Sequence, residues 1–471
     1  MIKNLLFPLA LAILLTGKPD TAAAAAVAPA KLVNVAVNQP PVTSMVATAS
    51  TLARPLPVKE QVLPNGLKVL LLERHTAPVI SFQVWYRVGS RNEPLGQTGI
   101  SHLCEHLMFQ GSKNYPTGKY DELVNAMGGN NNAFTTEDYT AYYINFPSAQ
   151  LELAAQLEAD RMANLLIPAE KFASEVNVVK EERRWRTENS PFGMMWEMLG
   201  ATAYAQHSYR WPVIGWMGDL ERLTRDQAYD YYKAHYLPNN AIVVVVGDFV
   251  PVKALEIIKR NFGHLKAGEL PTAEVTQEVP QSGERRVEII RDVETGAVMV
   301  AYHIPAKGDR DFYTLEVLER ILAKGRSARL YHDLVYTRQL AEEVGAMTLE
   351  NRDPGLFLAY AVPLPKHTTA ELERELRQAL ERLKTEDVTD YELQKAINQA
   401  EASFIFGQQK NFEVGSQLGS NEALRDWQLV NDFLPKIRAV TKQDIRRVAA
   451  KVFTRMNRSV VTLVPAKEVK D

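Results

Sequence analysis

The sequence predicts an α+β fold built from two homologous halves, each an α/β sandwich in which helices cover an antiparallel-rich sheet. Three observations support this prediction. The chain has 471 residues, which exceeds the usual domain length of roughly 100–200 residues. Segments with strand-like apolar alternation are interspersed with longer helical patterns. Stretches of the first half also recur in the second half. The composition, 46% hydrophobic and 23% charged, is typical of a globular protein.

The N-terminus has the features of an export signal. One lysine precedes the apolar run Leu5–Leu15, which is too short to span a bilayer as a helix. Small residues follow it, so we expect cleavage near Ala26 or Ala30. Residues 1–26 are therefore predicted to be a signal peptide, and residues 27–57, rich in Ala, Val, Pro and Thr, a linker. The mature protein is expected in the periplasm or secreted, without stable membrane insertion; a retained N-terminal anchor is the alternative.

Charge and cysteine content exclude two other classes of protein. The formal net charge is −2, whereas nucleic-acid-binding proteins usually carry a basic excess, so no nucleic-acid partner is expected. The chain has a single cysteine, Cys104, which excludes an intrachain disulfide framework. We expect Cys104 to serve in packing.

The first half, predicted over residues 58–265, opens with a hairpin. Asn65-Gly66 lies between two apolar runs, as in a tight β-turn. Every second residue is then apolar from Ile80 to Val88, which predicts a half-buried strand. Helical patterns and one strand-type stretch follow, with Gly128-Gly129 ending the second helix. The helices are expected over 99–110, 117–127, 148–166 and 168–188, and the strand-type stretch over 130–146.

The second half, predicted over residues 285–471, repeats the first. The stretch LTRDQAYDYYKAHYLPNNAIVVVVGD aligns without gaps with VTKQDIRRVAAKVFTRMNRSVVTLVP, which places Thr224 on Thr441, 217 positions apart. Each stretch is a threonine-capped helix, a turn and a strand. An internal duplication explains this likeness. Residues 266–284, polar and proline-bearing, are predicted to connect the halves.

The stretch GISHLCEHLMFQGS, residues 99–112, carries the pattern H-x-x-E-H. On a helix that advances about 100° per residue, His106 lies about 40° from His102, so both can bind one metal ion. Glu105 lies at about 300°, beside the pair, where it can hold a water on that ion. The alternative is an ordinary surface helix with two histidines. The second half has no histidine pair at the equivalent place.

A catalytic zinc site needs a third protein ligand and an open position for water. The helical stretch SEVNVVKEERRWR offers Glu175, Glu181 and Glu182, and Glu188 follows it. Glu175 and Glu182 are seven residues apart and share a helix face to within about 20°. One of the two can ligate while the other supports it. A solvated charged helix is the alternative interpretation, and it suits Glu181 and Glu188.

These stretches, together with GGNNNAFTTEDYTAYY, resemble the inverzincin metallopeptidases of the pitrilysin and insulinase family over nearly the whole chain after residue 58. The resemblance implies paired α+β halves and one Zn²⁺ per chain. It also implies that His102, His106 and Glu182 are the metal ligands, because the spacing from His106 to Glu182 matches the family pattern. Glu175 is then the supporting carboxylate, and Glu105 the general base.

The resemblance also implies how substrates bind. Asn132, Ala133 and Phe134 correspond to the family's edge strand beside the zinc, which holds a peptide by strand addition. A plain hairpin strand is the alternative. Family members with a complete substrate clamp carry an arginine and a tyrosine, where this chain has Val335 and Glu342. The expected partner is therefore a homologous second chain in a heterodimer, or a second copy in a homodimer.

The sequence thus predicts an exported zinc metalloendopeptidase for peptides or unfolded polypeptide segments, acting through zinc-activated water and the base Glu105. Two alternatives are a non-catalytic structural or assembly subunit on the same fold, and a dedicated processing peptidase for one partner protein.

Overall fold

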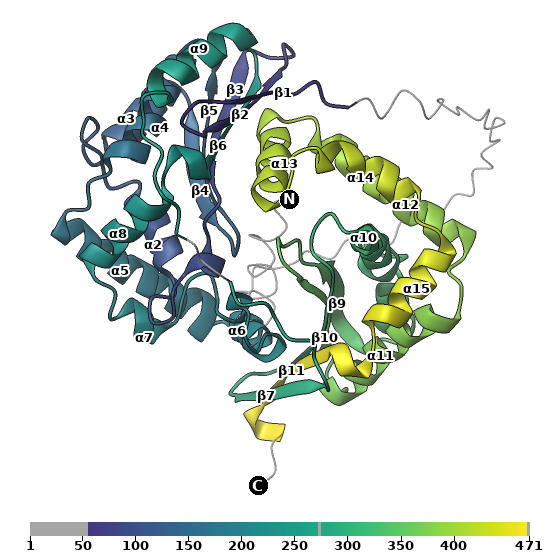
Figure 1. Ribbon diagram of the computed structural model, residues 1–471. Helices are drawn as coiled ribbons and strands as arrows, with labels where there is room; N and C mark the ends of the chain where they lie inside the picture. Colours follow the sequence, from purple (N-terminus) through teal and green to yellow (C-terminus); the bar gives the residue numbers. More distant parts are fainter. Residues whose placement is uncertain (1–54, 272–274, 469–471) are drawn as a thin grey trace, which may run out of the picture.

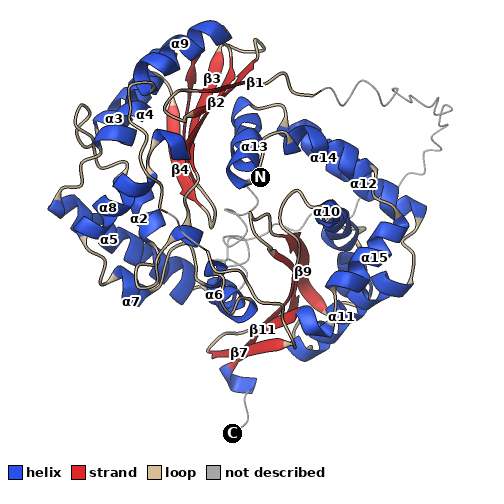
Figure 2. Cartoon of the chain, viewed as in Figure 1, coloured by secondary structure: helices blue, strands red, loops and turns tan. Residues whose placement is uncertain are grey.

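The computed structural model describes residues 55–271 and 275–468. The predicted signal peptide, residues 1–26, and most of the predicted linker lie outside these residues. The chain forms two β-sheets with helices on their outer sides (Figure 1). The predicted α+β fold with two sandwich halves is confirmed. Figure 2 shows that each half combines a sheet with helices, and the two kinds of element alternate along the chain.

The first sheet has six strands in the order β1-β2-β6-β3-β5-β4. Only the β2–β6 pair is parallel; the other pairs are antiparallel. The predicted hairpin at Asn65-Gly66 joins β1 to β2, with Gly66 at a φ of 84°. The strands are β1 (Lys59–Val62), β2 (Lys68–Glu73), β3 (Val79–Tyr86), β4 (Asn130–Thr135), β5 (Thr140–Pro147) and β6 (Ala241–Gly247).

The second sheet repeats this topology in the order β7-β11-β8-β10-β9, and its β7–β11 pair is again the parallel one. Strand β1 has no counterpart among the described residues of the second half. The two aligned stretches also fold alike, because Thr224 and Thr441 each cap a helix through a capping box. The strands are β7 (Arg285–Arg291), β8 (Ala297–His303), β9 (Ala341–Thr348), β10 (Leu356–Pro363) and β11 (Arg458–Pro465).

Helices cover both sheets and follow the predicted order, with shorter bounds. A helical stretch expected over 168–188, for example, is an α-helix only to Arg183 and continues as a π-type turn, Arg184–Glu188. The helices of the first half are α2 (Ile100–Leu107), α3 (Lys119–Ala126), α4 (Leu151–Asn164), α5 (Ala169–Arg183), α6 (Pro191–Ala203), α7 (Met217–Leu220), α8 (Arg225–His235) and α9 (Pro251–Phe262). Those of the second half are α10 (Arg310–Ala323), α11 (Thr369–Thr385), α12 (Asp390–Gly407), α13 (Asn411–Leu424), α14 (Leu429–Arg438) and α15 (Lys442–Val452).

The two halves exchange a helix. Helix α13 of the second half packs on β3 and β6 of the first sheet, as its place in Figure 1 indicates. Its Val414 and Leu418 are fully buried in one cluster with Trp85. The approach is so close that a Cβ on Gly419 would lie 2.2 Å from the Trp85 ring, so only glycine fits there. Removing α13 would expose this apolar face of the first sheet.

Helix α6 of the first half makes the reciprocal contact. It packs on β7, β8 and β11 of the second sheet. Its buried Phe192, Met195 and Leu199 form one cluster with side chains such as Met299 and Leu358. Each half therefore completes the core of the other, and neither sheet has both of its faces covered by its own half alone.

This exchange corrects one prediction. Strand β3 was expected to be half-buried, with its apolar face inward. Both faces are buried, because α13 covers the side that carries Ser81, Gln83 and Trp85. The Gln83 side chain donates a hydrogen bond to the Phe412 carbonyl at 3.0 Å, which satisfies its amide in this contact.

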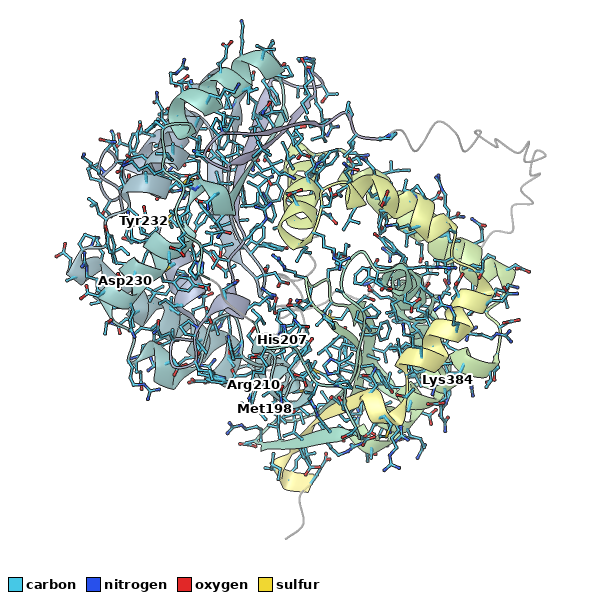
Figure 3. All side chains as sticks on the ribbon, viewed as in Figure 1. Met198, His207, Arg210, Asp230, Tyr232 and Lys384 are labelled. Atoms are coloured by element: carbon cyan, nitrogen blue, oxygen red, sulfur yellow. The ribbon has the colours of Figure 1, made fainter. Side chains whose placement is uncertain are left out.

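Polar contacts also join the halves next to the β4–β5 turn. The Asp138 carboxylate accepts hydrogen bonds from the Tyr209 hydroxyl at 2.6 Å and from the Arg352 amide at 3.0 Å. Asp353 pairs with Arg91 at 2.6 Å and with His207 at 3.0 Å. His207, labelled in Figure 3, lies where the two halves meet. Between residues 55 and 468, as far as they are described, no helix is both long and apolar enough to cross a membrane.

We expect Leu418→Ala to destabilise the whole chain by about 2–5 kcal/mol, because it opens a cavity between α13 and the first sheet. Unfolding followed by circular dichroism and by tryptophan fluorescence should show one shared transition at a lower temperature. The matched control is Phe406→Ala, whose side chain is 65% exposed and whose loss should cost less than about 0.5 kcal/mol. Two separate transitions, with the first half unaffected, would contradict the exchange of helices as a stabilising link.

Candidate metal centre

The helix that carries H-x-x-E-H is held at its N-terminus by a buried carboxylate. Glu93 accepts hydrogen bonds from the amides of Gly99 and Ser101, both at 2.9 Å. These amides belong to the first turn of α2, whose donors have no partner within the helix. Leu103, Cys104 and Leu107 face the core of the first half, as expected for Cys104. The opposite face of α2 presents the histidines toward α5 and β4.

The three predicted metal ligands converge. His102 Nε2 lies 3.7 Å from Glu182 Oε2, and His106 Nε2 lies 3.5 Å from the same oxygen. One donor atom from each residue lies within 4.8 Å of the other two, and no other such group occurs in the described part of the chain. Two imidazoles and a carboxylate are the donors that zinc prefers, at about 2.0–2.2 Å each. The residues therefore fit a zinc ion after small side-chain movements.

Glu175 lies where a supporting residue is needed. Its Oε2 is 3.2 Å from His106 Nδ1, and its Oε1 accepts a hydrogen bond from Gln110 at 2.9 Å. This contact fixes the ring so that Nε2 faces Glu182, as carboxylates commonly do for metal-binding histidines. The Nδ1 atom of His102 is buried without a hydrogen-bond partner among the described residues.

Burial and mutual contacts shift the pKa values of the three predicted ligands strongly. Burial, together with the nearby His106, lowers the pKa of His102 to about 4. For His106, burial opposes the charged form, but hydrogen bonds to Glu175 and Glu182 outweigh it and raise the pKa to about 9. Burial also opposes ionisation of Glu182, yet the hydrogen bond to His106 and the charges nearby lower its pKa to about 2. A metal ion bound here would replace the proton on His106.

Glu105 lies beside the ligands, as predicted for a base. Its Oε2 accepts a hydrogen bond of 2.5 Å from the hydroxyl of Thr135, at the end of β4. Burial raises the pKa of Glu105 to about 7, and the bond to Thr135 opposes part of that rise. A carboxylate with a pKa near neutrality can both accept and return a proton, which is what general acid–base catalysis requires.

Four residues of this site escaped the sequence analysis: Glu93, Gln110, Thr135 and Arg186. Arg186 Nη1 contacts Glu182 Oε1 at 2.7 Å. All four act on a predicted site residue or its helix, and none of them is in a metal-ligand pattern. The spacing of four between Glu182 and Arg186 was the one available signal, because i,i+4 residues share a helix face.

The predicted substrate strand is an edge. Strand β4 pairs with β5 and with no other strand of the first sheet. Asn132 is exposed, Ala133 is partly buried, and Phe134 packs edge-on against Trp85 with ring centroids 5.5 Å apart. The sheet thus ends in a strand beside Glu105, and no described strand pairs with the outer edge of its backbone. Strand addition needs such an open edge.

Among its described residues, the second half has no group of side chains that could hold a metal ion. Val335 lies in a π-type turn, Tyr331–Thr337, against the second core, and Glu342 is exposed on β9. Strand β9 is the topological counterpart of β4. Among the residues that the structure describes, the candidate metal group therefore lies in the first half.

Comparisons with known proteins agree with this division. The family model described as Insulinase (Peptidase family M16) matches residues 68–215, which contain all the predicted site residues. The model described as Peptidase M16 inactive domain matches residues 222–400.

Individual relatives cover both halves. Zinc protease PqqE of Helicobacter pylori is 35% identical over 417 residues, which are 87% of this chain and 94% of that protein. The crystal structure of a protease from Helicobacter pylori superposes with a TM-score of 0.85 at 33% identity, over 88% of this chain and 100% of that one. A Pseudomonas fluorescens structure described as a peptidase M16 inactive domain shares the fold, with a TM-score of 0.80 at 19% identity over 87% of this chain and 98% of that one. The chain therefore belongs to the M16 peptidase family, the insulinase family.

Proposed function

We propose that this chain is an exported zinc metalloendopeptidase that hydrolyses peptides or unfolded polypeptide segments, with one zinc ion held by His102, His106 and Glu182. The observation that carries this proposal is the convergence of these three donors beside Glu105. The relatives named zinc proteases support both the metal and the activity. A periplasmic or secreted location follows from the predicted signal peptide.

A non-catalytic subunit on the same fold is the main alternative. A similar solved structure is described as a peptidase M16 inactive domain, and part of this chain matches a family model with that description. That match falls on residues 222–400, whereas the metal donors and Glu105 fall within residues 68–215. Because the first half keeps all three metal donors close together, with Glu105 beside them, we favour the catalytic function.

The residues have distinct parts in the proposed reaction. A zinc ion in this site would polarise the scissile carbonyl and activate the attacking water. Glu105 takes a proton from that water and passes it to the leaving amine. Thr135 holds the Glu105 carboxylate in place through its hydroxyl. Glu175 holds the ring of His106.

The substrate would lie along β4. An extended peptide that pairs with Asn132, Ala133 and Phe134 gains backbone hydrogen bonds whatever its side chains. This mode suits unfolded segments of varied sequence, and it passes the peptide beside Glu105. A dedicated processing peptidase would use the same contacts and take its selectivity from the walls around them.

We further propose that a second chain completes the substrate site. Val335, which packs against the second core, and Glu342, which is exposed, stand where the family resemblance implies an arginine and a tyrosine. An apolar and an acidic side chain cannot replace that clamp. A homologous chain that carries this pair would supply it in a heterodimer. In a homodimer, other residues would have to hold the peptide.

We expect Glu105→Gln to keep zinc and to lose about 10²–10⁴-fold in peptidase rate, because the amide keeps the shape but accepts no proton. Cleavage of a quenched fluorescent peptide measures the rate, and atomic absorption measures the metal. Unchanged circular dichroism is the control for folding. A variant that cleaves near the rate of the unmodified enzyme would remove Glu105 from the role of base.

We expect the purified chain alone to cleave peptides slowly and a second, different chain to accelerate it. Positioning a bound peptide can lower the activation barrier by about 7–11 kcal/mol in favourable cases. A chain with an incomplete clamp should obtain only part of this lowering. Size-exclusion chromatography combined with activity assays measures both properties, with and without a co-expressed homologue. A homodimer that works at full rate, and that no partner accelerates, would contradict the heterodimer and leave the zinc mechanism intact.

A further inference from the structure

The two carboxylate oxygens of Glu182 have different partners. Oε2 faces the Nε2 atoms of His102 and His106, at 3.7 and 3.5 Å. Oε1 is bound by Nη1 of Arg186 at 2.7 Å. A terminal carboxylate torsion has broad rotational freedom, so this division of the oxygens needs a cause. The bond to Arg186 is the contact that holds Oε1 away from the histidines.

The backbone of Arg186 is itself fixed. Arg186 lies in the π-type turn Arg184–Glu188, a type of irregularity that often marks functional sites. Helix α6 then packs directly on this turn, so that a Cβ on Gly193 would lie 1.9 Å from the Arg186 carbonyl oxygen. The Ser190 hydroxyl caps α6 by accepting a hydrogen bond from the Gly193 amide. The guanidinium therefore extends from a rigid base, although its side chain is 51% exposed.

We propose that Arg186 is a positioning residue for the metal site: its bond to Oε1 orients Glu182 so that Oε2 alone is presented to the metal. This inference rests on the proposed zinc site and assigns it a residue outside the ligand set. Residues that orient metal ligands typically change metal affinity by about 10–100-fold when they are replaced.

Orientation of Glu182 by Arg186 should strengthen metal binding, whereas the positive charge of Arg186 should weaken it. A positive guanidinium repels Zn²⁺, so removing it could strengthen binding. Because the Arg186 side chain is half exposed, solvent and salt screen that repulsion. The charge-assisted bond between Arg186 and Glu182 is a direct contact. Solvent screens it less at the Glu182 end, because the Glu182 side chain is only 17% exposed. We therefore expect orientation to outweigh repulsion.

The test is the zinc dissociation constant of the full-length mature chain, measured by competition with chromophoric chelators of graded affinity. Arg186→Met should weaken zinc binding about 10–100-fold. Arg186→Lys keeps the charge and one donor, and should restore part of the affinity. Arg184→Met is the matched control, because Arg184 lies in the same turn but pairs with Glu181, whose side chain is 69% exposed; its affinity should stay within about twofold.

A double-mutant cycle separates orientation from other effects. In a Glu182→Ala background, Arg186→Met should weaken zinc binding no further, because no side-chain oxygen remains at position 182 for Arg186 to orient. An equal loss in both backgrounds, or unchanged or tighter binding in Arg186→Met itself, would overturn this inference. A wild-type chain that binds no zinc would instead refute the proposed function.

Discussion

The packing of α2 against α5 is the constraint on which the site depends. Neither helix carries the proposed ligand set alone: α2 holds the two imidazoles and α5 holds the carboxylate, 76 positions after His106. Buried groups fix both helices. Glu93 holds the first turn of α2, and Arg183, at the end of α5, donates a hydrogen bond to the Gly215 carbonyl at 2.6 Å. Tertiary packing thus brings the three proposed ligands together, with one donor atom of each within 4.8 Å of the other two.

The second half supports this arrangement without contributing donors. Helix α6, which clamps the turn carrying Arg186, lies on the second sheet. The turn between β4 and β5, close to Thr135, is tied to Arg352 through Asp138. Both the proposed carboxylate ligand, Glu182, and the proposed base, Glu105, therefore connect to the second half through a few contacts. The second half, which has no metal-ligand group among its described residues, thus supports the proposed site through packing and hydrogen bonds.

Much of this organisation could be read from the sequence. The aligned stretches around Thr224 and Thr441 indicated the duplication. The spacing of H-x-x-E-H predicted that both histidines share one face of α2, because helical periodicity is a local property. The exchange of α6 and α13 was not predictable, because an apolar helix face predicts burial but does not identify the sheet that it packs on. The close approach of Gly419 to Trp85, for example, joins residues that are more than 300 positions apart in the sequence. Thr135 and Arg186 were missed because ordinary polar residues gain a role only through tertiary contacts.

The central claim is that His102, His106 and Glu182 together hold one zinc ion. Metal analysis of the purified chain and of two neighbouring variants tests it most directly. We expect one zinc per chain in the unmodified protein and in Glu181→Gln, whose side chain is exposed and pairs with Arg184. Glu182→Gln should lose most of its zinc, because an amide is a weak ligand for zinc and carries no charge. Full zinc in Glu182→Gln, or loss of zinc in Glu181→Gln, would contradict the account.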